Sequence, residues 1–79
     1  MTPGAELVEY LARRLVENPD AVSVDEVEED GALVIQLRVA PEDLGRVIGR
    51  GGRIARALRT LVRAGGAHGD RRVLLEIVE

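Results

Sequence analysis

The apolar positions near the start of the chain predict a helix. Between residues 5 and 17, leucines, valines and alanines recur three or four positions apart, which is the spacing of an amphipathic helix. Thr2 or Gly4 can cap its beginning, with Pro3 in the first turn. The Asn18-Pro19 pair ends it, because proline disfavours helical backbone in the residue before it.

Three later segments carry the patterns of β-strands. Residues 21–28 form a β-branched run that ends in acidic residues. In residues 32–39 the side chains alternate between two faces, the pattern of a half-buried strand: one face carries Leu33, Ile35, Leu37 and Val39, and the other carries Val34, Gln36 and Arg38. Asp30-Gly31 stands between these two runs and is typical of a tight hairpin turn. Residues 72–78 alternate in the same way and predict a last strand, which follows a turn at residues 68–70.

Two helices are predicted between the second and third strands. Pro41 and the acidic residues after it favour a short helix over residues 41–48. This helix must break at residues 49–52, where three of four residues are glycine. A second helix follows over residues 53–64 and ends at Gly65-Gly66. Its predicted apolar stripe consists of Ile54, Leu58, Leu61 and Val62, with Arg56, Arg59 and Arg63 on the opposite side.

These elements together predict an α+β fold in the order α-β-β-α-α-β. The hairpin makes the first two strands antiparallel, whereas the helical crossover favours parallel pairing of the second strand with the third, with a right-handed connection. We therefore expect one domain over residues 1–79, built on a three-stranded mixed sheet whose helices pack on one face.

Charge is distributed unevenly along the chain, which changes how its net value of −3 is interpreted. Residues 1–30 hold nine acidic residues against two arginines, a local charge of −7. Residues 44–63 hold six arginines and no acidic residue, a local charge of +6. A merely solvated helix face is expected to mix both signs, so the second segment predicts a surface that binds anions.

The composition argues against several classes of protein. The chain has no Cys and no Lys, its only histidine is His68 and its only serine is Ser23, so we expect no enzyme, no cofactor and no metal site. No apolar run approaches the ~20 residues of a membrane span, and Glu6 and Glu9 stand where a signal peptide would be basic. We therefore predict a cytoplasmic protein without a membrane partner.

Residues 47–54 carry the most informative motif. Gly49, Gly51 and Gly52 lie between two predicted helices, and glycine lets the backbone approach another group closely. The helix that follows contributes unpaired N–H groups at its beginning, and Arg50 and Arg53 add formal positive charge. A dinucleotide or P-loop site fits poorly, because the loop follows a helix and no lysine is present. A phosphodiester backbone fits all of these features.

This loop resembles the GXXG loop of the KH domain, which clamps a short stretch of single-stranded nucleic acid. The order of elements resembles the type II KH domain. The likeness extends over the first helix, Asn18-Pro19-Asp20 and residues 37–61, and it is closest to the small bacterial one-domain KH proteins of the KhpA family. The chain departs from its relatives at Arg50-Gly51, where they often place a basic residue beside a polar one. We expect Gly51 to loosen the loop and lower its affinity.

The resemblance implies a function and a set of site residues. It implies binding of single-stranded RNA, action as an RNA chaperone, and a role in cell-wall homeostasis and cell length. It also implies a homodimer, or a complex with a second KH protein of the KhpB (Jag/EloR) type. The predicted RNA-binding residues are Gly49, Arg50, Gly51, Gly52, Arg53, Arg46, Ile48, Ile54 and Arg56.

Tyr10 is the only aromatic residue, so bases are expected to lie on aliphatic side chains instead. The candidates for this aliphatic groove are Val39, Leu44, Val47, Ile48, Ile54 and Leu58.

An interaction or dimerisation module of KH fold, with little or no RNA binding, is the alternative function. Not all apolar strand residues fit on one covered sheet face, and those left over would offer a surface to a partner. The residues concerned are Val22, Val24, Val34, Leu74 and Val78.

Overall fold

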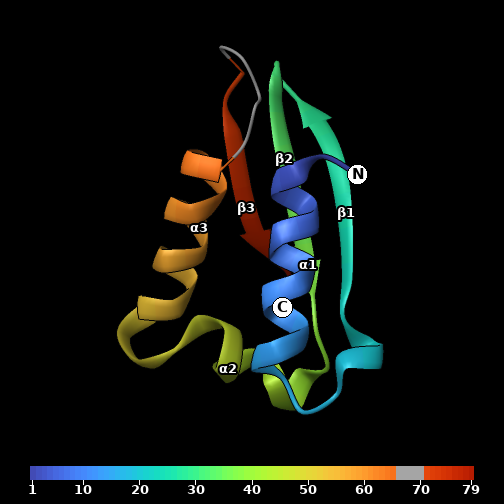
Figure 1. Ribbon diagram of the computed structural model, residues 1–79, viewed down its shortest axis with the longest axis vertical. Helices are drawn as coiled ribbons and strands as arrows, with labels where there is room; N and C mark the ends of the chain where they lie inside the picture. Colours follow the sequence, from blue (N-terminus) through green and yellow to red (C-terminus); the bar gives the residue numbers. More distant parts are fainter. Residues whose placement is uncertain (66–70) are drawn as a thin grey trace.

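The computed structural model describes residues 1–65 and 71–79 and contains a three-stranded sheet with its helices on one face (Figure 1). The α-helices are α1 (Pro3–Leu15), α2 (Leu44–Ile48) and α3 (Arg53–Gly65), and the strands are β1 (Ser23–Glu29), β2 (Ala32–Arg38) and β3 (Val73–Ile77). Three single 3-10 turns, η1 (Pro19–Ala21), η2 (Pro41–Asp43) and η3 (Arg50–Gly52), connect them. The α+β fold predicted from the sequence is confirmed. The turn predicted at residues 68–70 lies outside the described residues.

Helix α1 begins as the sequence predicts and ends earlier. The Thr2 hydroxyl accepts a hydrogen bond from the backbone N–H of Ala5, and Pro3 occupies the first turn. The helix stops at Leu15, and Val16 is already extended. The backbone N–H groups of the next two residues bond to a carboxylate elsewhere in the chain instead of to helix carbonyls. The tertiary structure therefore shortens this helix by two residues.

The sheet has the predicted order and directions. β1 and β2 are antiparallel, and Asp30 and Gly31 between them both have positive φ, 49° and 78°, as a tight hairpin turn requires. β2 and β3 are parallel, with Ile35 opposite Leu75. The strand order is β1-β2-β3, so the residues between β2 and β3, including α2 and α3, form the crossover.

The core lies between the sheet and the two long helices. Leu33, Ile35 and Leu37 of β2 point into it together with Val73 and Leu75 of β3. From the helices come small and medium side chains, which let the helix axes approach the sheet closely. These are Ala5, Val8 and Ala12 of α1 and Leu58 and Val62 of α3.

One side chain of α3 lies on a different face from the one predicted. Leu61 was expected in the buried stripe, but 45% of its surface is exposed. Ala55 is buried instead, with 4% of its surface exposed. Because 3.6 residues make a turn, Ala55, Leu58 and Val62 share the inner side of this helix and Leu61 is rotated away from it.

The two leucines of α3 provide a matched test of this helix orientation. Leu58→Ala is expected to lower the free energy of unfolding by about 2–5 kcal/mol, because it leaves a cavity in the core. Leu61→Ala removes the same atoms from an exposed site and is expected to change it by about 0.5 kcal/mol or less. Denaturant unfolding at low protein concentration measures both. Equal losses would contradict this placement of α3.

Candidate nucleic-acid interface

The glycine loop, residues 49–52, forms a tight turn between α2 and α3. It begins at Gly49, with φ 77° and ψ 169°, a backbone conformation that is almost confined to glycine. Gly51 is left-handed, with φ 65° and ψ 17°, and Gly52 also has positive φ. The Gly52 N–H donates to the Gly49 carbonyl at 3.1 Å and the Arg53 N–H donates to the Arg50 carbonyl. These bonds within the turn give the loop a defined shape.

The glycines of the loop are required for different reasons. A Cβ atom at Gly49 would lie 2.6 Å from Cγ1 of Ile54 and 2.9 Å from its backbone N, so the fold itself excludes a side chain there. A Cβ atom at Gly51 or Gly52 would meet no atom within 4 Å. The second half of the loop is thus open toward solvent, and the absence of side chains leaves its backbone accessible.

Five arginines surround the loop and continue along α3. Among residues 1–65 and 71–79, no carboxylate lies in ion-pair range of any of the five, whereas Arg13, Arg38 and Arg71 each have an acidic partner. The five are Arg50, Arg53, Arg56, Arg59 and Arg63, and all are exposed. In the described parts of the chain, their positive charge is therefore available to an external anion.

Arg56 also holds the loop itself. Its Nη2 atom donates a hydrogen bond to the Gly51 carbonyl at 2.9 Å. A carbonyl oxygen near a phosphate repels it, and the guanidinium offsets this repulsion while it keeps its charge. The sequence predicted Arg56 as a binding residue, and the structure places it against the backbone of the motif.

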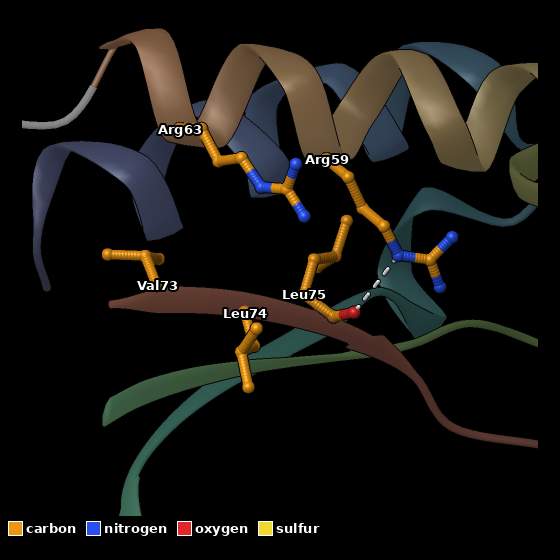
Figure 2. Close-up of a pocket in the computed structure, with 5 residues that line it drawn as sticks. All are labelled: Arg59, Arg63, Val73, Leu74 and Leu75. Atoms are coloured by element: carbon orange, nitrogen blue, oxygen red, sulfur yellow. Dashed lines mark hydrogen bonds between the residues drawn. The ribbon is translucent and has the colours of Figure 1, made fainter. Parts of the chain in front are cut away.

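A groove of about 120 Å³ lies between α3 and the edge of β3. Figure 2 shows Arg59 and Arg63 reaching from α3 toward the strand, where Val73 and Leu75 face them and Leu74 points to the opposite side. Arg59 Nε lies 3.4 Å from the Leu75 carbonyl oxygen and donates to it. The sequence predicted both arginines on an outward helix face. Only the parallel pairing of β3 brings a strand edge beneath them.

The predicted aliphatic groove is only partly accessible. Val47 and Leu58 belong to the core, with 0% and 4% of their surfaces exposed, so their prediction as base contacts is wrong. Ile48 and Ile54, which flank the glycine loop, are half-buried, as are Val39 and Leu44. An amphipathic pattern identifies an apolar side chain but does not tell whether both of its flanks are covered.

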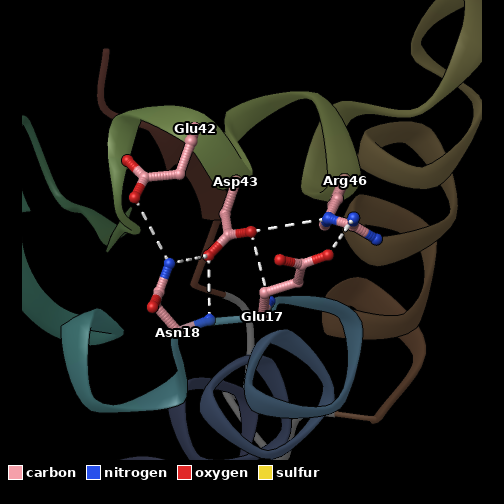
Figure 3. A network of polar contacts seen from close by, with 5 residues as sticks. All are labelled: Glu17, Asn18, Glu42, Asp43 and Arg46. Atoms are coloured by element: carbon pink, nitrogen blue, oxygen red, sulfur yellow. Dashed lines mark hydrogen bonds and ion pairs between the residues drawn. The ribbon is translucent and has the colours of Figure 1, made fainter.

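Arg46 differs from the other arginines of this segment. Its Nη2 atom lies 2.6 Å from Glu17 Oε1 and its Nε atom 3.5 Å from Asp43 Oδ1 (Figure 3). Two carboxylates thus already neutralise its charge. We expect Arg46 to contribute less to anion binding than the five arginines of the loop and α3, although it follows the same charge pattern in the sequence.

Asp43 is a buried carboxylate with a full set of donors, and sequence reasoning did not single it out. Only 1% of its surface is exposed. Burial by itself raises the pKa of such a carboxyl, but the backbone N–H groups of Glu17 and Asn18, the Asn18 side chain and the Arg46 charge together hold the pKa of Asp43 below its ordinary value. The carboxylate is therefore ionised at neutral pH, where its contribution to stability is fully present.

Comparison with known proteins identifies the family of this chain. Residues 5–77 match the family described as the KH domain of KhpA/KhpB. The chain belongs to this family. The KhpA resemblance predicted from the sequence is thereby confirmed.

Curated relatives cover nearly the whole chain. An RNA-binding protein KhpA from Aquifex aeolicus is 53% identical over 79 residues, which is 100% of both chains. One from Caldanaerobacter subterraneus is 52% identical over 73 residues, covering 92% of this chain and 97% of the relative, and one from Treponema pallidum is 48% identical over 79 residues, covering 100% and 99%. The glycine loop can therefore be compared with the corresponding segment of KhpA proteins.

Two glycine substitutions test the geometry of the loop without any ligand. Gly49→Ala is expected to lower the free energy of unfolding by about 1–3 kcal/mol through backbone strain alone, and by more because Ile54 must move. Gly51→Ala is expected to lower the free energy of unfolding by only roughly 1–2 kcal/mol, because alanine must adopt a left-handed backbone there. Thermal and denaturant unfolding compare them. A Gly49→Ala protein as stable as Gly51→Ala would show that the loop does not pack on Ile54.

Proposed function

We propose that this chain binds single-stranded RNA by holding its phosphate backbone against the glycine loop and the arginines of α3. The observation that carries the proposal is the separation of charge. The loop and α3 present five arginines that lack acidic partners among the described residues. Support comes from relatives that are named RNA-binding proteins and match the chain over 92–100% of its length.

The loop suits a phosphate for reasons of shape as well as charge. Gly51 and Gly52 have no side chain, so a phosphodiester can approach their backbone without a clash. Arg50 is exposed beside them, and Arg53 stands at the beginning of α3, where the helix dipole adds partial positive charge. Such contacts position a backbone and carry no direct information about base identity.

Aliphatic side chains are proposed to receive the bases. Ile48 and Ile54 are half-buried beside the loop and keep part of their surface free. The groove between α3 and β3 adds a strand edge and two guanidinium planes, on which bases can stack. Tyr10 belongs to α1, where the Arg14 guanidinium covers its ring at 4.4 Å from the centroid. We therefore infer binding without aromatic stacking, which makes each contact weak and reversible.

A double substitution in the loop tests RNA binding. Arg50→Asp with Gly51→Asp is expected to abolish binding to single-stranded RNA, because it replaces one positive charge by two negative ones beside the backbone site. The fold should persist, since both positions are exposed and Asp tolerates a left-handed backbone. Asp30 of this chain already has a φ of 49°. RNA affinity and thermal midpoint are measured side by side.

A control variant with the same change in net charge distinguishes an effect at the loop from an effect of overall charge. Arg13→Asp with Ala21→Asp alters exposed residues on α1 and η1 and is expected to leave most of the affinity intact. If the loop variant stays folded and binds RNA as tightly as the parent, the proposal that this loop binds RNA is wrong. The alternative function as an interaction module would then be favoured.

We further propose that the protein acts in the cytoplasm as an RNA chaperone, without catalytic activity, in processes that affect cell-wall homeostasis and cell length. Weak backbone contacts are suited to this work, since a chaperone must release the RNA it remodels. The family membership supports this part of the proposal. Within the described residues, no helix has the length and apolar character that a membrane span needs.

Association with a second KH domain is also proposed. We propose self-association, and also pairing with a KhpB-type protein, which the family description supports because it joins KhpA with KhpB. Some apolar surface is free for it. Leu61 of α3 is exposed, and Val27 and Leu74 flank the buried Val34 on the sheet face opposite the helices. A small domain without disulfides gains stability from such an interface.

Solution mass tests the association. A dimer is expected at micromolar concentration by light scattering, or a one-to-one complex when a purified KhpB-type KH protein is added. Burial of exposed apolar surface drives the association, so it should persist at high salt, unlike RNA binding. A monomeric mass at all concentrations, together with no complex with the KhpB-type protein, would contradict it.

A further inference from the structure

We propose that Asp43 is a positioning residue for RNA binding: its carboxylate joins the end of α1 to the beginning of α2 and so sets the position of the glycine loop. This inference rests on the proposed RNA-binding function. It concerns a buried group that the charge pattern of the sequence did not indicate. The carboxylate would act through the backbone of α2 and would not contact RNA.

The carboxylate connects two segments that are far apart in the sequence (Figure 3). Oδ1 accepts a hydrogen bond from the Glu17 backbone N–H at 3.1 Å. Oδ2 accepts one from the Asn18 backbone N–H at 3.0 Å and one from its side-chain Nδ2 at 3.3 Å. The Arg46 Nε atom lies 3.5 Å from Oδ1. Asp43 thus replaces the helix carbonyls that Glu17 and Asn18 would otherwise need.

Helix α2 depends on such external contacts because it is short. It has only five residues, Leu44–Ile48, and isolated helices of that length are not stable in water. Asp43 anchors its beginning and the buried side chain of Val47 anchors its inner side. The Gly49 N–H donates to the Gly45 carbonyl, so the loop starts directly from the last turn of this helix.

The other end of the loop is held by α3. α3 packs in the core through Leu58 and Val62, and Ile54 contacts the position of Gly49 so closely that no Cβ fits. A shift of α2 would therefore change the loop relative to α3, and the backbone of Gly51 and Gly52 would no longer face the phosphate together with the α3 arginines. The geometry of the RNA-binding site therefore depends on the contacts that hold α2 in place.

Asp43→Asn is the decisive variant, and Glu42→Gln is its matched control. Asn keeps the size of the side chain but turns one acceptor oxygen into an NH2 donor that faces backbone N–H groups. Glu42 is the adjacent acid and is exposed, and among the described residues its carboxylate accepts one hydrogen bond, from the Asn18 side chain at 3.4 Å. Both substitutions remove one negative charge at this end of the molecule, so electrostatics alone would strengthen RNA binding by both.

The positioning role predicts opposite results for the two variants. Asp43→Asn is expected to weaken affinity for a single-stranded oligoribonucleotide on the order of tenfold, by analogy with the loss seen when residues that orient metal ligands are removed. Glu42→Gln should bind as tightly as the parent or slightly more tightly. Affinity is measured at a temperature where circular dichroism shows all proteins fully folded, so that a loss of stability alone does not lower it.

Amide chemical shifts of Gly49, Gly51 and Gly52 in the RNA-free protein give a second readout. They are expected to move in Asp43→Asn and to stay in place in Glu42→Gln. If Asp43→Asn does not fold, Asn18→Ala takes its place, because it removes one donor and leaves the carboxylate buried; a smaller move of the same amides is then expected.

Two outcomes overturn the proposal. One is a folded Asp43→Asn protein with unmoved loop amides and parental or tighter RNA affinity. The other, if that variant does not fold, is an Asn18→Ala protein with unmoved loop amides. A parent protein that binds no RNA would instead refute the proposed function, while the loop amides would still report whether Asp43 positions the loop.

Discussion

The parallel pairing of β2 with β3 is the constraint on which the rest of this structure depends. Parallel neighbours cannot be joined by a tight turn, so the chain must leave the sheet where β2 ends and cross back to the end where β2 began. α2 and α3 belong to that crossover, and α3 forms its returning arm across the helix-covered face of the sheet. The glycine loop lies where the crossover changes direction. The glycines that let the chain turn sharply there therefore also leave its backbone exposed to a ligand.

Two different forces hold the two ends of this loop. α3 is fixed by apolar contact, through side chains that lie in the same core as β2 and β3. α2 contributes only Val47 to that core, with Leu44 packed against it, and is held in addition by the polar contacts of Asp43. A buried carboxylate is stable only if its oxygens are satisfied, and the end of α1 supplies the missing donors. The early end of α1 and the position of α2 thus have one common cause.

Charge is arranged so that the structural and the binding roles of arginine separate. Arg46 is held between Glu17 and Asp43, and Arg13, Arg38 and Arg71 also have acidic partners. Surface pairs of this kind add little stability, but they neutralise both charges locally. The acidic residues of the first thirty positions are concentrated on α1, β1 and the hairpin. Positive charge is therefore concentrated on the loop and α3, where the described residues include five arginines without an acidic partner, although the net charge of the chain is −3.

The sequence by itself determined the elements, their order, the hairpin, the parallel crossover and the location of the glycine loop. These depend on local properties: side-chain periodicity, the backbone freedom of glycine and the restriction imposed by proline. Only the tertiary structure decided the rest. It buried Val47 and Leu58, turned Leu61 outward, paired Arg46 and brought Arg59 and Arg63 over the edge of β3. It also gave Asp43 its role, because its donors lie 25 and 26 positions earlier in the chain, and no local pattern records which distant N–H groups a carboxylate will meet.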